Sequence, residues 1–524
     1  MPSRRRFFRS LVALGGLRAA RADSIGVNEP DKRREAALKL RQDAAMAQSL
    51  RGQAPQAGNG DQAIPRWVAC FTKGLPHSQL GEVEAGAYES LLEAIASGKH
   101  ADFERVARGS GRRFVSPQAA YAYHLEGTDS HRLGCPPPPA FSSAEAAAEM
   151  VELYWQALAR DVSFADYAAS PLVRQAAQEL GQTPDTVFRG PTPGDRRGPY
   201  ISQFLLKPVS YGSTPIDQRY RTPPPGADFM TSFSEWLQIQ TGVPPWRPSV
   251  FDETRRYIRN GRDLAEYVHY DFLYQAFLNA ALILMNNTPE AVLDQNQYWS
   301  ELNPYKKSKA QDGFVTFGYA MAVDWLARVT TAAIKAAWCQ KWLVHRRTRP
   351  EEFGARIHQT KTGAASYPIH PMVLDSQALE QTRQRFGTHL LPQAYPEGCP
   401  LHPAYPSGHA TVAGACITAL KALFDESALL TNCVEAAADG LSLLPCGDHI
   451  PTVGEELNKL AFNVAMGRNF AGIHYRTDAT GGLLLGEEIA ISVLQDLVLT
   501  LNEDFEGFRF TRLDGTRTMI SKPS

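Results

Sequence analysis

Residues 313–343 read GFVTFGYAMAVDWLARVTTAAIKAAWCQKWL, and this stretch decides the fold class. Its apolar side chains recur at three- and four-residue steps, which predicts one long helix near 315–345. They also cover most of the circumference of that helix. Because a helix that is apolar on most sides is buried, we expect this one inside a bundle and not on a surface.

The same periodicity predicts four more long helices, near 262–286, 409–424, 454–470 and 479–503. Few segments alternate polar and apolar residues, none of them is long, and no repeat has a solenoid period. The expected fold is therefore all-α, with helical bundles (two four-helix bundles) and long proline-rich loops.

The first half of the chain alternates helical patterns with proline-rich connectors. Cys135 is followed by four prolines, and three further proline clusters predict extended loops at 191–194, 223–226 and 244–246. Ser142-x-x-Glu145 has the form of a capping box that opens an alanine-rich helix. We expect a helical arm over 23–60, a helical region with these loops over 61–250, and a bundle over 251–510 that carries the functional site.

The N-terminus carries a separate signal. Ser3-Arg-Arg-Arg-Phe-Phe-Arg9 precedes an apolar stretch from Leu11 to Leu17 and then Ala20-Arg-Ala22. Residues 1–22 resemble a twin-arginine export signal, which would place a folded protein in the periplasm or outside the cell. The alternative is a basic disordered arm on a cytoplasmic protein.

Composition restricts the class of protein. The 524 residues include 54 Lys and Arg against 55 Asp and Glu, a net charge of −1, which argues against a nucleic-acid binder. Hydrophobic residues make up 44%, so a large core is expected. No apolar run approaches the roughly 20 residues of a membrane span, and we expect a soluble protein.

The seven cysteines are scattered and include no CxxC pair. Their odd number leaves at least one without an intrachain partner, and the spacing of zinc ligands is absent. We interpret most of them as small buried apolar residues.

Three short segments carry groups that could bind an anion, and the first holds Lys341 and Arg349 just before Pro350. Eight residues of helix rise about 12 Å and turn through about 80° net, so both side chains can project to the same side. Two long cations so placed can close on one small anion. The alternative is an ordinary cationic helix C-terminus, which the helix dipole favours.

The second segment is Pro406-Ser-Gly-His409, placed before an alanine-rich helical run. Backbone N–H groups and the positive end of the helix would face one point there, which makes an anion site. Ser407 adds a hydroxyl donor, Gly408 permits close approach, and His409 titrates near neutrality. The alternative is a serine N-cap with a surface histidine.

The third segment holds Arg468, His474 and Asp478. An unbroken helix would point Arg468 and His474 apart, so we expect Gly472 to end the helix and let His474 turn back. Asp478 could accept a hydrogen bond from one ring nitrogen of His474 and fix its tautomer. A surface His–Asp pair is the alternative.

Together the three segments supply three cations, a Ser-Gly turn and two histidines, with no carboxylate expected to face inward. Such a set, which we call the oxyanion cage, fits phosphate or an oxyanion of the same shape.

The order of these motifs resembles that of the type 2 phosphatidic acid phosphatase superfamily, which includes acid phosphatases and vanadium-dependent haloperoxidases. The finer resemblance is to the algal and cyanobacterial vanadium bromoperoxidases. It covers residues 335–490 and is carried by Lys341-Trp-x-Val-His-Arg-x-x-Arg349-Pro, His402-Pro-x-Tyr-Pro-Ser-Gly-His-Ala-Thr and Gly454-Glu-x-x-Asn-Lys-Leu-Ala-x-Asn-Val-Ala-x-Gly-Arg468. Seven residues separate the two cations, where the phosphatases typically have six.

The resemblance implies orthovanadate as the bound anion, with His474 bonded to vanadium through a ring nitrogen. It assigns the vanadate oxygens to Lys341, Arg349, Arg468, Ser407 and the Gly408 amide, and acid–base catalysis to His409. His402 matches an outer histidine of the bromoperoxidases and favours bromide and iodide over chloride, although a turn histidine is the alternative. Trp338 lies in a segment that lines the halide site of some members, although core packing is its alternative.

The implied activity is oxidation of bromide or iodide by hydrogen peroxide to hypohalous acid, which halogenates organic nucleophiles. The resemblance also implies a homo-oligomer (a dimer or larger) and a structural calcium, for which no ligand loop can be located. The main alternative is an acid phosphatase in which His474 forms a phosphohistidine and His409 protonates the leaving alcohol. A third alternative is a non-catalytic oxyanion-binding or assembly protein.

Overall fold

The computed structural model describes residues 30–285, 298–447 and 449–522. The chain divides into two compact units, Met1–Ala47 and Gln48–Ser524. Helix α1 (Pro30–Ser49) lies almost wholly in the first unit, and the other elements lie in the second. The signal expected over residues 1–22 falls outside the described residues.

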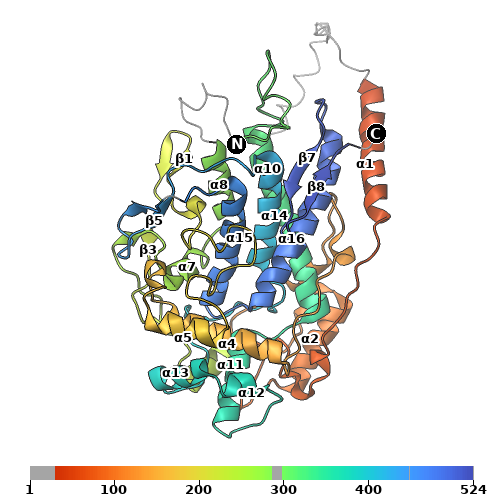
Figure 1. Ribbon diagram of the computed structural model, residues 1–524. Helices are drawn as coiled ribbons and strands as arrows, with labels where there is room; N and C mark the ends of the chain where they lie inside the picture. The colour runs from red at the N-terminus through yellow and green to blue at the C-terminus, as the bar shows by residue number, and fades with distance from the viewer. Residues whose placement is uncertain (1–29, 286–297, 448, 523–524) are drawn as a thin grey trace, which may run out of the picture. The chain divides into compact units, whose positions relative to one another are not determined.

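Helices dominate the second unit (Figure 1). They are α2 (Ala85–Ser97), α3 (His100–Phe103), α4 (Ala144–Ala159), α5 (Pro171–Glu179), α6 (Phe233–Gln240), α7 (Gly261–Tyr267), α8 (Gln275–Met285), α10 (Tyr319–Cys339), α11 (Pro350–Lys361), α12 (Pro371–Leu374), α13 (Gln377–Phe386), α14 (Gly408–Leu423), α15 (Val453–Phe470) and α16 (Arg476–Leu497). Short 3-10 helices are η1 (Asp61–Ala63), η2 (Pro65–Trp67), η3 (Pro117–Tyr121), η4 (Ser130–Arg132), η5 (Phe164–Asp166), η6 (Gln203–Leu205) and η8 (Val498–Thr500), and η7 (Gln340–His345) is a π-helix.

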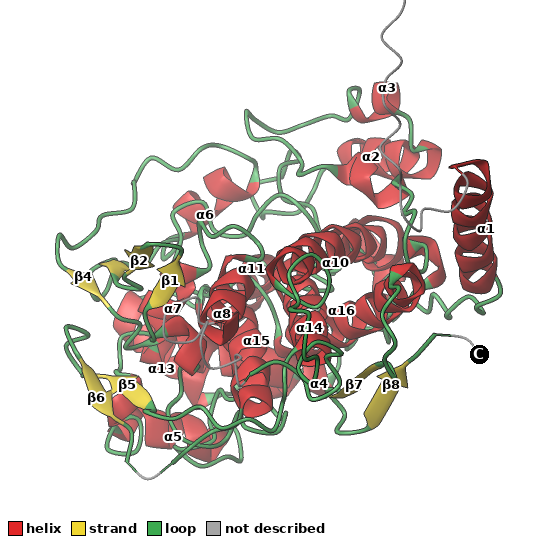
Figure 2. Cartoon of the chain, turned by 90° about the horizontal axis from the view of Figure 1, so that it is seen from above, coloured by secondary structure: helices red, strands yellow, loops and turns green. Residues whose placement is uncertain are grey.

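Among the described residues, the strands form four antiparallel two-stranded sheets at the edges of the helical core (Figure 2). The pairs are β1 (Val209–Tyr211) with β2 (Thr214–Ile216), β3 (Tyr220–Arg221) with β4 (Arg255–Arg256), β5 (Val434–Ala436) with β6 (Leu443–Pro445), and β7 (Phe508–Thr511) with β8 (Arg517–Ile520). The expected all-α class is confirmed by this mainly helical structure, whereas the number of bundles stays a prediction.

Helix α14 is the centre of the core and packs against α10, α15 and α16 (Figures 1 and 2). Its closest neighbour is α16, because glycines remove side chains from the contact. A Cβ atom at Gly482 of α16 would lie 2.8 Å from the carbonyl oxygen of Ser407 and 2.9 Å from Cβ of Ala410. Helix α14 can therefore lie directly against α16 with its N-terminus beside that of α16.

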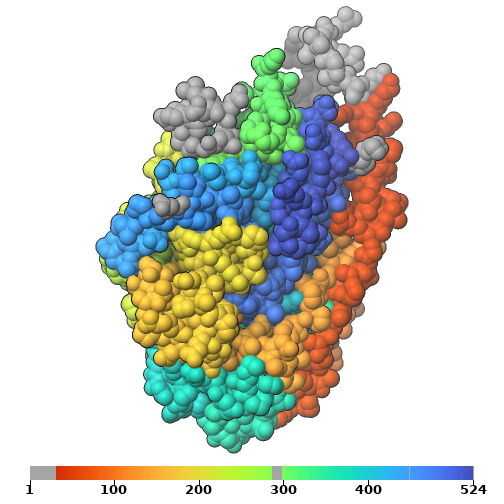
Figure 3. All heavy atoms as spheres, in the orientation of Figure 1, coloured from red at the N-terminus to blue at the C-terminus, as the bar shows by residue number. Residues whose placement is uncertain are grey.

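One continuous hydrophobic core contains side chains from both sides of residue 250, such as the fully buried Trp155 and Leu264. On the face shown in Figure 3, segments of the first half of the chain, coloured orange and yellow, lie over the central helices. The proline clusters lie in loops and in no helix or strand, as predicted. The boundaries expected at residues 60 and 250 stay predictions. No helix within the described ranges has the length and apolar character needed to cross a bilayer.

The helices predicted near 409–424, 454–470 and 479–503 are confirmed as α14, α15 and α16, and the last begins three residues early and ends six early. The helix predicted near 315–345 exists as α10, but its last turn is the π-helix η7. The single helix predicted over 262–286 is wrong, because the chain breaks between α7 and α8. In that break His269 stacks on Tyr395 and Asp271 contacts His409, and these tertiary contacts outweigh the helical periodicity.

Two smaller predictions also need correction. The capping box expected at Ser142 does not form, because α4 begins one residue later and Ser143 accepts the hydrogen bond from the backbone N–H of Ala146. Cys433 and Cys446 form a disulfide that the scattered spacing did not predict. The other five cysteines are buried and free, which confirms the interpretation of most of them.

Candidate functional site

Lys341 and Arg349 both donate to one short segment of backbone, residues 402–404. The Lys341 Nζ atom donates to the carbonyl oxygens of Pro403 at 2.8 Å and Ala404 at 2.7 Å. Arg349 Nε donates to the carbonyl oxygen of His402 at 2.9 Å. Both cations are fully buried.

The helix expected to carry both cations is wrong, although the two side chains do converge. Lys341 lies in the π-helix η7, and Arg346 after it adopts a left-handed conformation with φ of 46°. The chain then extends to Arg349, which is the N-cap of α11. The turn at Arg346, and not helical periodicity, brings the second cation back toward the first.

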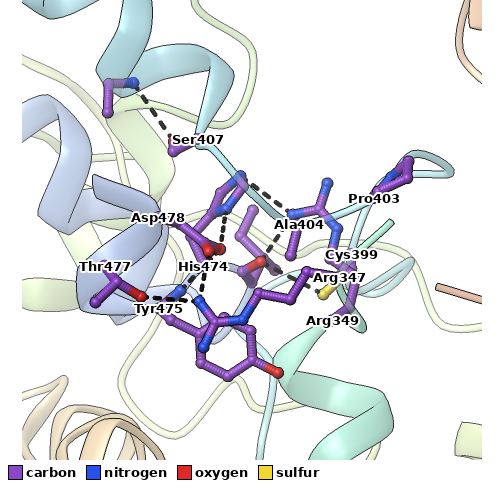
Figure 4. Close-up of polar contacts among 12 residues, drawn as sticks. Arg347, Arg349, Cys399, Pro403, Ala404, Ser407, His474, Tyr475, Thr477 and Asp478 are labelled. Atoms are coloured by element: carbon purple, nitrogen blue, oxygen red, sulfur yellow. Dashed lines mark hydrogen bonds and ion pairs between the residues drawn. The ribbon is translucent and has the colours of Figure 1, made fainter. Parts of the chain in front are cut away.

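His474 lies between Arg349 and Asp478 (Figure 4). Its Nδ1 atom lies 2.8 Å from Asp478 Oδ2, and its Nε2 atom lies 3.1 Å from Arg349 NH1. Because the carboxylate can only accept, Nδ1 carries the proton and Nε2 presents a lone pair. A left-handed turn at Gly472, with φ of 84°, ends α15 as predicted and directs His474 back toward the cations.

Asp478 is held in turn by Arg347, whose NH1 lies 2.8 Å from Asp478 Oδ1 (Figure 4). Arg347 NH2 donates to Glu149 Oε2 on α4 at 2.7 Å. Burial disfavours the charge of Arg347, but Glu149 and Asp478 together raise its pKa above the ordinary value. The sequence reasoning missed this role of Arg347 because Glu149 is 198 residues away in the chain.

The N-terminus of α14 supplies Ser407, Gly408 and His409, as predicted. Ser407 is the N-cap and its Oγ accepts from the backbone N–H of Ala410 at 3.4 Å. A Cβ at Gly408 would lie 3.1 Å from Ile334 Cδ1 and 3.3 Å from Trp338 Cζ3, so a larger residue would crowd this end of the helix.

His409 pairs with Asp271, a contact that no sequence signal indicated. Its Nε2 atom lies 3.0 Å from Asp271 Oδ1, in the break between α7 and α8. The side chain of His409 is 15% exposed, whereas that of His474 is 2% exposed. The site is therefore more open to solvent at His409 than at His474.

Arg468 extends from the last turn of α15 and donates through NH1 to the carbonyl oxygen of Val268 at 2.5 Å. The centre of its guanidinium group lies 5.5 Å from the Tyr395 ring. Its Nε atom is buried without a hydrogen-bond partner among the described residues. Within those residues, no carboxylate forms an ion pair with Lys341, Arg349 or Arg468.

The electrostatic field of the cage favours an anion. Burial, followed by the charges of Arg349, Lys341 and Arg468, holds the pKa of His474 well below its ordinary value. Burial and then Arg349 hold the pKa of Lys341 well below its ordinary value. Buried cations without a counter-ion are costly, and an oxyanion with several oxygens would satisfy them together with the free Arg468 Nε donor.

His402 and Trp338 border the cage on the side of Arg349 and Lys341. His402 Nδ1 lies 3.0 Å from Arg349 NH2, and the His402 and Trp338 rings are 4.7 Å apart. Burial, then Arg349 and Lys341, hold the pKa of His402 well below its ordinary value, so this ring is neutral. The structure thus places both residues beside the cage, and their role toward halide stays a prediction.

The calcium site also stays a prediction. Over the described ranges, no three His, Cys, Asp or Glu side chains lie close enough to hold a metal ion.

The site is a buried set of cations around an unprotonated histidine nitrogen, and it lies where the N-termini of α14 and α16 meet. These features define the class of oxyanion-binding helical-bundle enzymes. A family model described as the VCPO second helical-bundle domain matches residues 326–502, which include the whole cage. The chain is 32% identical to the vanadium-dependent bromoperoxidase of Corallina officinalis, over 95% of this chain and all of that protein. It is 36% identical to the vanadium-dependent bromoperoxidase of Ascophyllum nodosum, over 87% of each.

The structure is also similar to the homohexameric second vanadate-dependent bromoperoxidase (AnII) of Ascophyllum nodosum. The TM-score is 0.88 at 30% sequence identity, and the match covers 94% of this chain and 91% of the other. The chain belongs to the vanadium-dependent bromoperoxidase family. Membership makes it an oxidoreductase with haloperoxidase activity and implies vanadate as its cofactor.

Proposed function

We propose that this protein uses vanadate and hydrogen peroxide to oxidise bromide and iodide to hypohalous acid, which then halogenates organic nucleophiles. The observation that carries the proposal is the lone pair of His474 Nε2, which faces Arg349 in a cage whose three cations form no ion pair with a carboxylate among the described residues.

The donor set fits vanadate residue by residue. His474 Nε2 would ligate vanadium, while Lys341, Arg349 and Arg468 would hold its oxygens together with Ser407 Oγ and the Gly408 N–H at the start of α14. When bound, vanadate supplies Lewis-acid activation of hydrogen peroxide without a change of metal oxidation state.

The acid–base role belongs to His409. Asp271 accepts a hydrogen bond from the Nε2–H group of His409, so Nδ1 would take a proton from incoming peroxide and give it to the oxygen that leaves the site. His409 is also among the more exposed residues of the site, which suits exchange with solvent. The buried, neutral His402 ring and Trp338 would border the halide and favour bromide and iodide.

Three further proposals concern the whole protein. The hexameric relative supports a homo-oligomer, which light scattering of the purified protein tests. The basic N-terminal pattern supports export, which N-terminal sequencing of the protein from cell fractions tests. A structural calcium is tested by elemental analysis after dialysis.

The function is tested by adding vanadate to the apo-protein and measuring bromination of a phenolic dye with peroxide, alongside hydrolysis of a phosphate ester. We expect vanadate-dependent bromination with negligible hydrolysis. Hydrolysis without bromination would instead establish the acid phosphatase, in which His474 attacks phosphorus. A protein that binds vanadate and does neither would be a binding protein.

The His474→Ala variant should lose both vanadate retention and bromination. The matched control is His358→Ala, because His358 stacks on Phe233 and, within the described part of the chain, forms no hydrogen bond with a cage residue. If His474→Ala kept both properties, the vanadium ligand would lie elsewhere.

A further inference from the structure

Asp478 has its carboxylate hydrogen-bonded on both oxygens. Oδ2 accepts from His474 Nδ1 at 2.8 Å and from the backbone N–H of Tyr475 at 3.1 Å, and Oδ1 accepts from Arg347 NH1 at 2.8 Å. The orientation of the His474 ring therefore depends on a carboxylate whose far oxygen is held by Arg347 (Figure 4).

Arg347 is itself fixed from three directions. NH2 donates to Glu149 Oε2 at 2.7 Å, and NH1 also donates to Thr477 Oγ1 at 2.9 Å. The guanidinium group lies 3.8 Å from the centre of the Tyr475 ring. Glu149 Oε1 accepts from the backbone N–H of Thr477 at 2.6 Å, so α4 holds both the arginine and the first turn of α16.

The charge of Asp478 bears on anion binding. Its carboxylate is one imidazole ring away from the nitrogen that would ligate the anion, so an uncompensated charge there would repel the anion and attract the cage cations. Arg347 places a positive charge directly against that carboxylate. Arg347 thus leaves the charges of Lys341, Arg349 and Arg468 available to the anion.

We propose that Arg347 is a positioning residue for the oxyanion cage: it orients Asp478 toward His474 Nδ1 and compensates the Asp478 charge. This inference rests on the proposed function, since it assumes that the cage binds an oxyanion. In the described structure the Arg347 side chain forms its hydrogen bonds with Glu149, Thr477 and Asp478 and none with Lys341, Arg349 or Arg468, so it acts through Asp478 and His474.

Arg476 provides a matched control, because its partner Glu152 lies one turn further along α4 than Glu149. Arg476 pairs with Glu152 through Nε at 2.8 Å, as Arg347 pairs with Glu149. Arg476 also begins α16 and donates to the carbonyl oxygen of Arg189 at 3.1 Å. It forms no hydrogen bond to Asp478 or His474 in the described structure, so its loss removes a comparable ion pair without freeing the Asp478 carboxylate.

The experiment measures binding of orthovanadate and of inorganic phosphate to the purified apo-protein by isothermal titration calorimetry. We expect Arg347→Met to bind both anions at least tenfold more weakly than wild type, and Arg476→Met to stay within about twofold. Adding Asp478→Asn to Arg347→Met should recover part of the lost affinity, because it removes the uncompensated charge. Because phosphate is bound without catalysis, this readout is independent of turnover.

Wild-type affinity in Arg347→Met, or an equal loss in Arg476→Met, would overturn the inference while leaving the proposed function intact. Absence of vanadate and phosphate binding in the wild type would overturn both. If Arg347→Met fails to fold, the comparison of Arg347→Lys with Arg476→Lys decides. Lysine keeps the positive charge but cannot contact Asp478 and Glu149 at the same time. The Arg347→Lys variant should therefore bind both anions about threefold more weakly than the Arg476→Lys variant, and equal affinities would refute the proposal.

Discussion

Replacing Gly482 with alanine should weaken anion binding through the contact between α14 and α16. The new Cβ would lie 2.8 Å from the Ser407 carbonyl oxygen, 2.9 Å from Ala410 Cβ and 3.1 Å from the backbone nitrogen of Thr411. These are backbone and Cβ atoms, which cannot move aside by rotamer changes. The N-terminus of α14 must therefore shift by about 0.6 Å to restore ordinary contact distances of about 3.4 Å.

Two opposing terms set the effect on stability. Alanine favours a helix interior over glycine by about 1 kcal/mol, whereas overpacking of a tight contact costs about 1–3 kcal/mol. We expect a net loss of about 0–2 kcal/mol in the free energy of unfolding. Binding should suffer more, because the shift separates Ser407 and Gly408 from His474, and a misplacement of about 1 Å costs up to a hundredfold. A shift of about 0.6 Å then predicts a loss of about tenfold.

The assay is the vanadate dissociation constant together with urea unfolding, measured on Gly482→Ala and on Gly86→Ala. Gly86 lies in α2, and no atom lies within 4 Å of the position that a Cβ would occupy there, so alanine at this residue should be neutral or stabilising. If Gly482→Ala binds vanadate as the wild type does and gains stability like Gly86→Ala, the reasoning from close helix contact is refuted.

Three other outcomes are expected. Asp271→Asn should lower the turnover number for bromide by about tenfold to a hundredfold with vanadate affinity retained, because the asparagine NH2 group can donate to His409 Nε2 and so favour the tautomer with its proton on Nδ1; unchanged turnover would show that Asp271 does not set this tautomer. His402→Ala should change the KM for bromide and leave vanadate affinity within about threefold, and identical steady-state kinetics would remove His402 from the halide site. Burial and then Arg347 lower the pKa of His345 to about 4, so the unfolded chain binds more protons than the folded one as pH falls below about 6.5. Stability should then fall by about 1.4 kcal/mol per pH unit from about pH 6.5 to about 4, and His345→Gln should remove that part of the slope in urea unfolding; an unchanged slope would contradict the assignment.

The cage residues could be found from the sequence because their signals are local. Pro-Ser-Gly-His before an apolar helical run indicates a helix N-terminus, and Gly472 indicates where α15 must end. The periodicity of α14, α15 and α16 predicted their bounds within a few residues at most ends, since each is buried along most of its length.

What the sequence could not supply are partners that meet only after folding. Asp271 and His409 are 138 residues apart, and no composition or spacing links them. The break at residues 268–274 arises from the same tertiary contacts, so periodicity alone predicted one helix where two exist. The convergence of Lys341 and Arg349 was correct although the helical geometry used to predict it was wrong, because a left-handed turn replaced the expected helix.

The buried cysteines have a consequence for a protein that generates an oxidant. Thiolates, and not thiols, are the form that oxidants attack. Burial raises the pKa of Cys70 to about 11 and those of Cys135, Cys339 and Cys416 to about 12, and it holds the pKa of Cys399 well above the ordinary value. Near neutral pH all five are therefore protonated and shielded from solvent, and the remaining two sulfurs are already joined. The catalyst thereby keeps its cysteine thiols out of reach of the hypohalous acid it releases.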